Sequence, residues 1–186
     1  MSQFTITDLC LPGLKIIERQ CISDTRGFLS RLFCANELAV AGWHKPICQI
    51  NHSLTEKRGT VRGFHYQMAT HTEMKLVTCI RGEVWDVVID LRSDSPTFLQ
   101  SHAQTLSARN CNAVLIPEGF AHGFQAQTED SELVYFHTAG YCPQSEAGLR
   151  FDDPLLAVKW PIPAGEISVR DQSHPYLTTQ FKGIKL

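Results

Sequence analysis

Arg62–Gln67 reads RGFHYQ and Pro117–His122 reads PEGFAH, and these two stretches decide the fold that the sequence predicts. Each places a histidine, His65 or His122, at the edge of an apolar, strand-like run. Between them, the run MKLVTCI carries a lone cation, Lys75, amid apolar neighbours. We expect these groups to converge inside a β-barrel.

The segments around these stretches are short, rich in β-forming residues and separated by turn residues. A hairpin is predicted from Met74–Ile80 and Glu83–Leu91, joined by Arg81-Gly82. One helix is predicted, over Phe33–Trp43 with a stop at Gly42. Further strands are expected within Ile16–Phe33, Lys45–Ser53, Gly59–Gln67, Asn112–Ile116, Ala121–Ala126 and Glu132–Thr138. Short strands with frequent turns and little helix are typical of an all-β sandwich or barrel.

Composition limits the classes of protein and partner. The chain has 186 residues, 43% of them hydrophobic, and we expect one domain spanning 1–186. A net charge of −2 with scattered basic residues argues against nucleic acid or an anionic membrane as partner. No stretch approaches the ~18 apolar residues of a membrane span, and no signal peptide is recognisable. The seven cysteines, odd in number and without CxxC, indicate reduced and mostly buried thiols in a cytoplasmic protein.

The pattern P-x-G-x-x-H in PEGFAH resembles the second motif of the cupin superfamily, which implies a small jelly-roll (double-stranded β-helix) barrel. The first cupin motif supplies H-x-H, a glutamate and a later glycine. His65 fits the first histidine, whereas Gln67 occupies the second position. Counting back from Gly82, Lys75 occupies the carboxylate position.

These replacements bear on metal binding. Divalent metals take imidazole and carboxylate ligands, and an ammonium group in place of a carboxylate repels them. We therefore interpret the chain as a metal-free cupin in which Lys75 stabilises a developing oxyanion. The alternative is a retained metal site built from His65, His122 and a further group.

More segments are similar to the dTDP-4-dehydrorhamnose 3,5-epimerase family, in collinear order over about residues 11–172: DTRGF, NHS, RGFHYQ, KLVTCIRGEVWDVVIDLR, SPTF, LIPEGFAHGF, VYFHT and FDDP. The resemblance implies cofactor-independent epimerisation at C3 and/or C5 of a nucleotide-linked, foremost dTDP-linked, 4-keto-6-deoxyhexose. Such products serve deoxysugar biosynthesis, as for the rhamnose of lipopolysaccharide O-antigen. The C4 ketone acidifies the C3 and C5 hydrogens, so a base, an enolate stabiliser and an opposite-face acid are needed.

Motif positions in the resemblance imply a role for each residue. His65 matches the base, oriented by Asp171, Lys75 matches the enolate stabiliser, and Tyr135 matches the acid, chiefly for C5 inversion. The expected substrate-binding residues are Arg26, Gln49, Asn51, Arg62, His122 and Tyr141. Arg26 matches an arginine that binds the nucleotide, often across a dimer interface, so the resemblance implies a homodimer whose N-terminal segment crosses that interface.

Each residue also has a structural alternative. His65 and Tyr135 suit satisfied core positions, Lys75 an edge strand, and Asp171 and Arg26 exposed surface. His71, His102, His137 and His174 are interpreted as structural or surface residues.

Two geometric expectations follow from strand alternation. In the predicted hairpin, Asp86 lies diagonally near Lys75 and would hold its ammonium group. Strict alternation puts Arg62 and His65 on opposite faces, so both reach one site only through a bulge, which we expect at Gly63.

Three positions depart from the family pattern. Phe136 stands where lysine is usual, Gly140 where an aromatic residue precedes Tyr141, and Arg31 where a glutamate is common. We interpret all three as bearing on substrate recognition, which leaves open the nucleotide, the sugar and inversion at C3 alone. A metal-dependent cupin enzyme and a non-catalytic sugar-nucleotide-binding cupin remain the alternatives.

Overall fold

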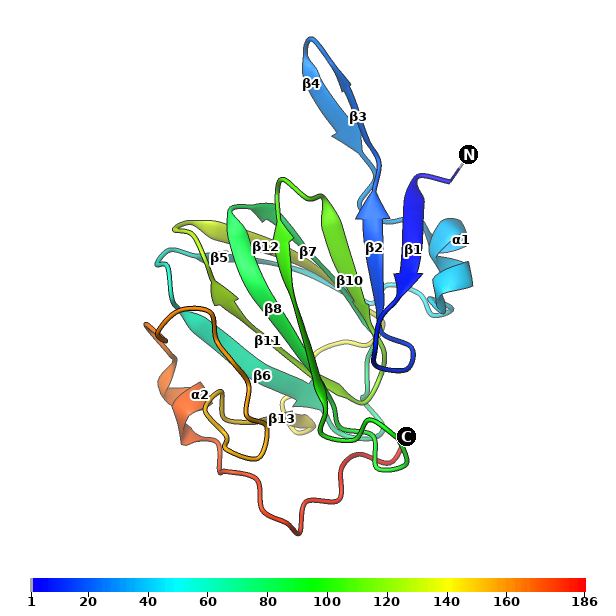
Figure 1. The fold of residues 1–186 in the computed structure, drawn as a ribbon. Helices are drawn as coiled ribbons and strands as arrows, with labels where there is room; N and C mark the ends of the chain where they lie inside the picture. Colours follow the sequence, from blue (N-terminus) through cyan, green and yellow to red (C-terminus); the bar gives the residue numbers. More distant parts are fainter. Residues whose placement is uncertain (1) are drawn as a thin grey trace.

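Two antiparallel sheets face each other in the structure, a computed structural model that describes residues 2–186 (Figure 1). The six-stranded sheet has the order β1-β2-β10-β7-β12-β5, and the five-stranded sheet has the order β13-β6-β11-β8-β9. A separate two-stranded hairpin, β3-β4, stands away from them (Figure 1). The predicted all-β class is confirmed.

The strands are β1 (Phe4–Asp8), β2 (Lys15–Arg19), β3 (Cys21–Asp24), β4 (Gly27–Ser30), β5 (Gln49–Thr55), β6 (Val61–Gln67), β7 (Lys75–Arg81), β8 (Glu83–Asp90), β9 (Ser101–Ser107), β10 (Asn112–Ile116), β11 (Phe120–Ala126), β12 (Ser131–His137) and β13 (Glu146–Gly148). The helical elements are α1 (Ala35–Leu38), the 3-10 turn η1 (Ala39–Ala41) and α2 (Val169–Ser173). Most predicted strands are present, whereas β1, β9 and β13 lack a distinctive sequence pattern and were not expected.

The main core lies between the two sheets. Val77 and Cys79 of β7 lie in one buried cluster with Val84 and Val88 of β8 and with Phe124 of β11. Both sheets are covered on their outer faces as well, so these central strands read as nearly continuous apolar runs rather than alternating ones.

The predicted hairpin between β7 and β8 is wrong. β7 pairs with β10 and β12, whereas β8 pairs with β11 and β9, so the chain crosses from one sheet to the other at Gly82. Gly82 has a φ of +71°, and an added Cβ would lie 2.5 Å from Thr128 Oγ1. A short glycine turn between two β-rich runs is equally compatible with a hairpin and with this corner. The pairing that decides between them comes from strands remote in sequence.

Separate clusters cover the outer faces of the two sheets. Leu38 and Trp43, from the predicted helical region, pack on the six-stranded sheet against Leu76 and Phe136. Gly42 ends this region with a φ of +101°, as predicted. On the five-stranded sheet, the C-terminal segment brings residues such as Leu149, Leu156 and Trp160 onto Phe64. The C-terminal segment also carries α2, and it thereby places Asp171 beside β6 (Figure 1).

Candidate active site

A cavity of about 530 Å³ lies between the two sheets and receives side chains from both. Its lining includes most of the polar groups singled out from the sequence: Gln49, Asn51, Arg62, His65, Lys75, His122, Tyr135 and Tyr141. Because these residues come from five strands and a loop, only the packing of the two sheets brings them together. The expected convergence of the two histidine stretches is confirmed.

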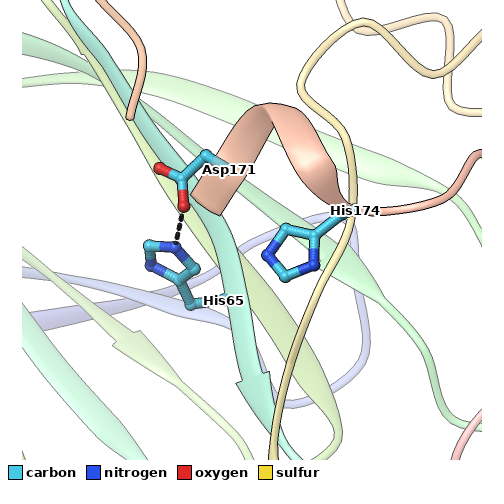
Figure 2. A group of neighbouring side chains, drawn as sticks. All are labelled: His65, Asp171 and His174. Atoms are coloured by element: carbon cyan, nitrogen blue, oxygen red, sulfur yellow. Dashed lines mark hydrogen bonds and ion pairs between the residues drawn. The ribbon is translucent and has the colours of Figure 1, made fainter. Parts of the chain in front are cut away.

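His65 and Asp171 form a hydrogen-bonded pair at the wall of this cavity. His65 Nε2 lies 2.7 Å from Asp171 Oδ1, and Asp171 is only 3% exposed (Figure 2). The second carboxylate oxygen of Asp171 accepts a hydrogen bond from Gly63 N at 3.2 Å. Burial opposes the charged carboxylate, but the hydrogen bond and charge of His65 lower the pKa of Asp171 below its ordinary value. An ionised Asp171 therefore faces Nε2 and leaves Nδ1 of His65 as the free base nitrogen.

The predicted bulge in β6 is present at Gly63. In the strand register, His65 lies opposite His122 and Arg62 lies opposite Phe124. The strand β6 therefore has one more residue than β11 over this interval. Gly63 has a φ of +109°, and a Cβ there would lie 2.7 Å from His122 O and from Gly123 Cα. Glycine is required here on both counts. The bulge lets Arg62 and His65 line the same cavity.

Lys75 is buried at the start of β7, and its partner differs from the predicted one. Lys75 Nζ lies 3.3 Å from Glu73 Oε1, and the other oxygen of Glu73 lies 2.8 Å from His137 Nδ1. Burial raises the pKa of Glu73, but the hydrogen bond from His137 and the charge of Lys75 lower it by more. The pKa of Glu73 is therefore below its ordinary value. The ammonium group is thus held by a carboxylate and aimed into the cavity.

Asp86, the predicted partner of Lys75, is paired with His122 instead. His122 Nε2 lies 2.6 Å from Asp86 Oδ2, and both residues are buried. The expectation was wrong because it assumed the β7–β8 hairpin. His65 and His122 thus belong to separate histidine–carboxylate pairs, and this disfavours the alternative metal site that joins these two histidines.

Tyr135 lies on β12, across the cavity from His65 on β6. Its ring packs edge-on against His122 and stacks on His137, with centroids 6.1 Å from each. The hydroxyl group is 3.3 Å from Ser53 Oγ. Burial raises the pKa of Tyr135 strongly, so the phenol stays protonated at neutral pH and is a proton donor.

Glu73 and His137 are cavity residues that the sequence interpretation missed. His137 was interpreted as structural or surface, yet it lies two residues after Tyr135 on the same strand and hence on the same face. Strand alternation, counted from Tyr135, was the sequence signal that would have placed His137 in the cavity. Glu73 lies in the loop before β7, where no periodic pattern indicates the direction of a side chain.

Gln49, Asn51 and Tyr141 lie at the polar rim. Gln49 Nε2 donates to Asn51 Oδ1 at 3.0 Å, and Tyr141 N donates to Gln49 Oε1 at 2.9 Å. Gln67, at the second cupin histidine position, is buried and braces the loop before β13: its Oε1 accepts from Cys142 N at 2.7 Å. Gln67 thus hydrogen-bonds to the backbone of this loop at the position where a metal-binding cupin would have a metal-ligating histidine.

Arg26 lies in the turn between β3 and β4, and it is not among the residues that line the cavity of its own chain. The β3-β4 hairpin projects from the two sheets (Figure 1). The Arg26 side chain is 87% exposed and paired with Asp24. Its role in nucleotide binding remains a prediction.

The three departures from the family pattern occupy different surroundings. Phe136 does not line the cavity, because strand alternation places its side chain on the opposite face from Tyr135. There it belongs to the outer cluster and stacks on Phe33, with the ring centroids 5.6 Å apart. Arg31 pairs with Glu37 and does not line the cavity of its own chain either. Gly140 does lie next to Tyr141, and a Cβ there would meet nothing within 4 Å. Of the three, Gly140 alone leaves added room at this chain's own rim.

The cysteines differ from expectation in burial. All seven carry free thiols, but Cys79 alone is buried, where desolvation raises its pKa to about 11. Cys10, Cys21 and Cys48 are exposed. Cys48 is exposed because it immediately precedes β5, which is an edge strand with an exposed face.

No described helix is long and apolar enough to cross a membrane. Within residues 2–186, one group of side chains has donor atoms close enough to hold a metal ion, namely His65, Asp171 and His174. Burial and the charge of His65 lower the pKa of His174.

The model of the dTDP-4-dehydrorhamnose 3,5-epimerase family matches residues 8–179. The enzyme of that name from Salmonella typhimurium is 37% identical over 169 residues, covering 90% of this chain and 92% of that protein. The one from Neisseria gonorrhoeae is 40% identical, but the chain spans about half of its length (47%).

Solved structures agree with these sequence matches. A Legionella pneumophila 3,5-epimerase in complex with dTDP-4-keto-L-rhamnose superposes with a TM-score of 0.92 at 34% identity, covering 98% of both chains. A 3'-monoepimerase from Streptomyces bikiniensis in complex with dTDP-quinovose has a TM-score of 0.84 at 31% identity, covering 90% of this chain and 85% of that chain. The fold is therefore the jelly roll predicted from the cupin resemblance, and the chain is an isomerase that belongs to the dTDP-4-dehydrorhamnose 3,5-epimerase family.

Proposed function

We propose that this protein epimerises C3 and/or C5 of a nucleotide-linked 4-keto-6-deoxyhexose, with a dTDP-linked sugar as the foremost substrate. The observation that carries the proposal is the placement of two proton-handling groups on facing walls. His65 comes from the five-stranded sheet and Tyr135 from the six-stranded sheet, with the cavity between them. A flat enolate held in that cavity presents one face to each group.

The first step removes a proton next to the ketone. Nδ1 of His65 accepts the proton from the carbon that is to be inverted, C3 or C5, the C–H electron pair forms the double bond between that carbon and C4, and the carbonyl electron pair moves to O4. Asp171 stabilises the resulting imidazolium and keeps its ring in place. Lys75, buried and held by Glu73, stabilises the negative O4.

The second step returns a proton from the opposite face, which inverts the carbon. Tyr135 is protonated at neutral pH and donates its hydroxyl hydrogen to the enolate carbon, chiefly at C5. The phenolate then recovers a proton from solvent, and His65 releases one. No electrons are gained or lost overall, so the reaction needs no redox cofactor, and in this proposal the Lys75 ammonium group supplies the positive charge at O4.

The β3-β4 hairpin supports a dimer in this proposal. Ile22, Phe28 and Leu29 are 59%, 66% and 74% exposed, an apolar surface on an element that projects from the barrel. Such a surface is typical of a docking element. We propose that it packs on a second copy of the chain and carries Arg26 to the nucleotide bound there. Arg26→Ala should then raise KM for the nucleotide sugar and leave kcat nearly unchanged.

The proposal extends to domain organisation, cellular location and pathway. The single chain works as one catalytic domain, in the cytoplasm, for deoxysugar biosynthesis such as that of O-antigen rhamnose. Free thiols and the absence of a described membrane-spanning helix are compatible with this setting.

The test is incubation with dTDP-4-keto-6-deoxyglucose in deuterated water, with EDTA present, while NMR follows the C3 and C5 hydrogens. We expect exchange at C3, at C5 or at both, with inversion of the exchanged carbon. A panel of other nucleotide forms of the same sugar tests whether the substrate carries a nucleotide other than dTDP. Absence of exchange with every form would overturn the proposal, and tight binding without exchange would favour the non-catalytic alternative.

A further inference from the structure

His174 lies immediately beside the His65–Asp171 pair, although the proposed reaction does not use it (Figure 2). One ring nitrogen each from His65 and His174 and one carboxylate oxygen of Asp171 all lie within 4.8 Å of one another. His174 Nε2 is buried and has no hydrogen-bond partner within residues 2–186. A buried imidazole nitrogen without a hydrogen-bond partner, next to a carboxylate and a second imidazole, is a donor that a metal ion can engage.

The position of His174 is fixed by its packing against β13. A Cβ at Gly148 would lie 2.1 Å from His174 Nε2, so the ring occupies the space that a side chain at Gly148 would need. Gly148 pairs with His65 in the sheet. Therefore β13 contacts both histidines, through its strand pairing with His65 and its packing against His174.

We propose that His65, Asp171 and His174 form a binding site for a divalent transition-metal ion, foremost Zn²⁺, and that a bound ion blocks the base; only this second part rests on the proposed function. Two imidazoles and one carboxylate are a ligand set suited to Zn²⁺, which binds them at about 2.0–2.2 Å. Ligand atoms in such a tetrahedral site are about 3.3 Å apart. Asp171 Oδ1 and His65 Nε2, now 2.7 Å apart, would need to separate by about 0.6 Å.

A second cavity lies next to two residues of this site. It has a volume of about 750 Å³, and His65, Asp171, Glu166 and Arg170 are among its lining residues. His65 lines both cavities, whereas Asp171 lines only the second, which gives an ion a second approach to the His65–Asp171 pair.

Arg170 is the feature that opposes cation binding. Its Nε lies 3.9 Å from Asp171 Oδ1. Both oxygens of Glu146 accept hydrogen bonds from its guanidinium group, at 2.7 and 3.0 Å, which offsets much of its charge. The side chain is also half exposed, and charges in water act weakly. Arg170→Gln should accordingly tighten metal binding.

Metal binding would block the base through the tautomer of His65. In the free protein, Nε2 carries the hydrogen that Asp171 accepts, and Nδ1 is unprotonated. A metal ion on Nε2 requires that nitrogen to be unprotonated, so the hydrogen moves to Nδ1 and the imidazole stays neutral. Nδ1–H cannot accept the proton of the substrate. The ion therefore acts as a reversible inhibitor, in contrast to the ion of a metal-dependent cupin.

The test uses Co²⁺ and Zn²⁺ with the full chain in a Cys111→Ser background. That background breaks up a competing thiol pair, because Cys21 Sγ and Cys111 Sγ lie 2.7 Å apart. His174→Phe keeps the ring volume and removes the donor nitrogens. His44→Phe, at an exposed histidine outside the cluster, is the matched control.

We expect one Co²⁺ per chain with visible absorption bands of a tetrahedral nitrogen–oxygen site, and a rise in melting temperature with Zn²⁺. His174→Phe should weaken Zn²⁺ binding at least tenfold, whereas His44→Phe should not. Unchanged binding in His174→Phe, or a thiolate-to-cobalt charge-transfer band, would overturn the site and leave adventitious binding only. Because these readouts need no substrate, they are independent of the proposed activity.

The inhibitory consequence has its own readout. In the exchange reaction, Zn²⁺ should stop the parent protein, EDTA should restore it, and His174→Phe should stay active at the same Zn²⁺ concentration. If Zn²⁺ binds at the site while exchange continues, the blocking mechanism is wrong. If Zn²⁺ binds and exchange never occurs in any sample, the metal site stands and the proposed function fails.

Discussion

The Nε2 atom of His65 lies 2.7 Å from Oδ1 of Asp171, although 106 residues separate the two in the chain. One residue comes from the middle of β6 and the other from α2 in the C-terminal segment. Ser168 caps α2 by accepting a hydrogen bond from Asp171 N at 3.0 Å, which fixes where the carboxylate points. The orientation of the base therefore depends on the docking of a short, distant helix.

Asp171→Asn should slow C3 exchange by about 10²–10⁴-fold without unfolding the protein. The amide of asparagine donates its hydrogen to Nε2, which favours the tautomer with Nδ1 protonated and removes the base. NMR exchange rates and circular dichroism melting curves measure the two effects. Asp94→Asn, at an exposed aspartate, should stay within threefold of the parent. Equal rates for Asp171→Asn and the parent would remove Asp171 from the mechanism.

Lys75→Met should lower the exchange rate by about 10²–10³-fold, because the negative enolate oxygen loses its nearest cation. Methionine fills similar space, and Glu73 keeps His137 as a partner, so the fold should persist. Single-turnover rates, with bound substrate checked separately, distinguish loss of chemistry from loss of affinity. A rate within threefold of the parent would contradict a role for the ammonium group.

Gly63→Ala should destabilise the protein by at least ~1–3 kcal/mol, because the residue has a φ of +109° and its new Cβ would meet His122 O at 2.7 Å. It should also reduce exchange, since the bulge carries both Arg62 and His65. Gly140→Ala is the control: nothing lies within 4 Å of its Cβ, so its free energy of unfolding should change by less than ~0.5 kcal/mol. Urea unfolding measures both. Similar losses in the two variants would argue against the bulge as the cause.

Glu73 should make the stability of the protein depend on acid pH. Its pKa is lowered in the folded state, so it contributes stability above the ordinary value of 4.5, and this stability is lost as the pH falls through the lower folded value. Glu73→Gln should therefore cost on the order of 2 kcal/mol at pH 7 and progressively less toward pH 3. Urea unfolding across this pH range gives the difference. Glu129→Gln, at an exposed glutamate, should show no such trend, and a constant difference for Glu73→Gln would refute the assignment.

Much of the site was predictable because family motifs and local patterns agree on it. His65, Lys75, His122 and Tyr135 converge as expected, and the bulge at Gly63 followed from a conflict between strand alternation and function. The same alternation, applied to Tyr135, would have placed His137 in the cavity and Phe136 outside it. These two errors lay within reach of the sequence.

Other errors came from pairing between distant segments. A glycine turn such as Gly82 does not reveal whether the next strand stays in the same sheet, and the partner of Lys75 depended on that choice. His174 follows α2 at the end of a loop-rich segment, where no periodicity indicates what it contacts. Only the docking of that segment on β6 and β13 brings it to His65.

The most direct test of the central claim is one NMR time course in deuterated water with dTDP-4-keto-6-deoxyglucose, comparing the parent, His65→Ala and Tyr135→Phe. With His65 as the proposed base and Tyr135 as the proposed opposite-face acid, the parent should incorporate deuterium, His65→Ala should incorporate none, and Tyr135→Phe should retain C3 exchange more than C5 exchange. Exchange by His65→Ala at the parental rate would contradict the assignment of the base and, with it, the proposed mechanism.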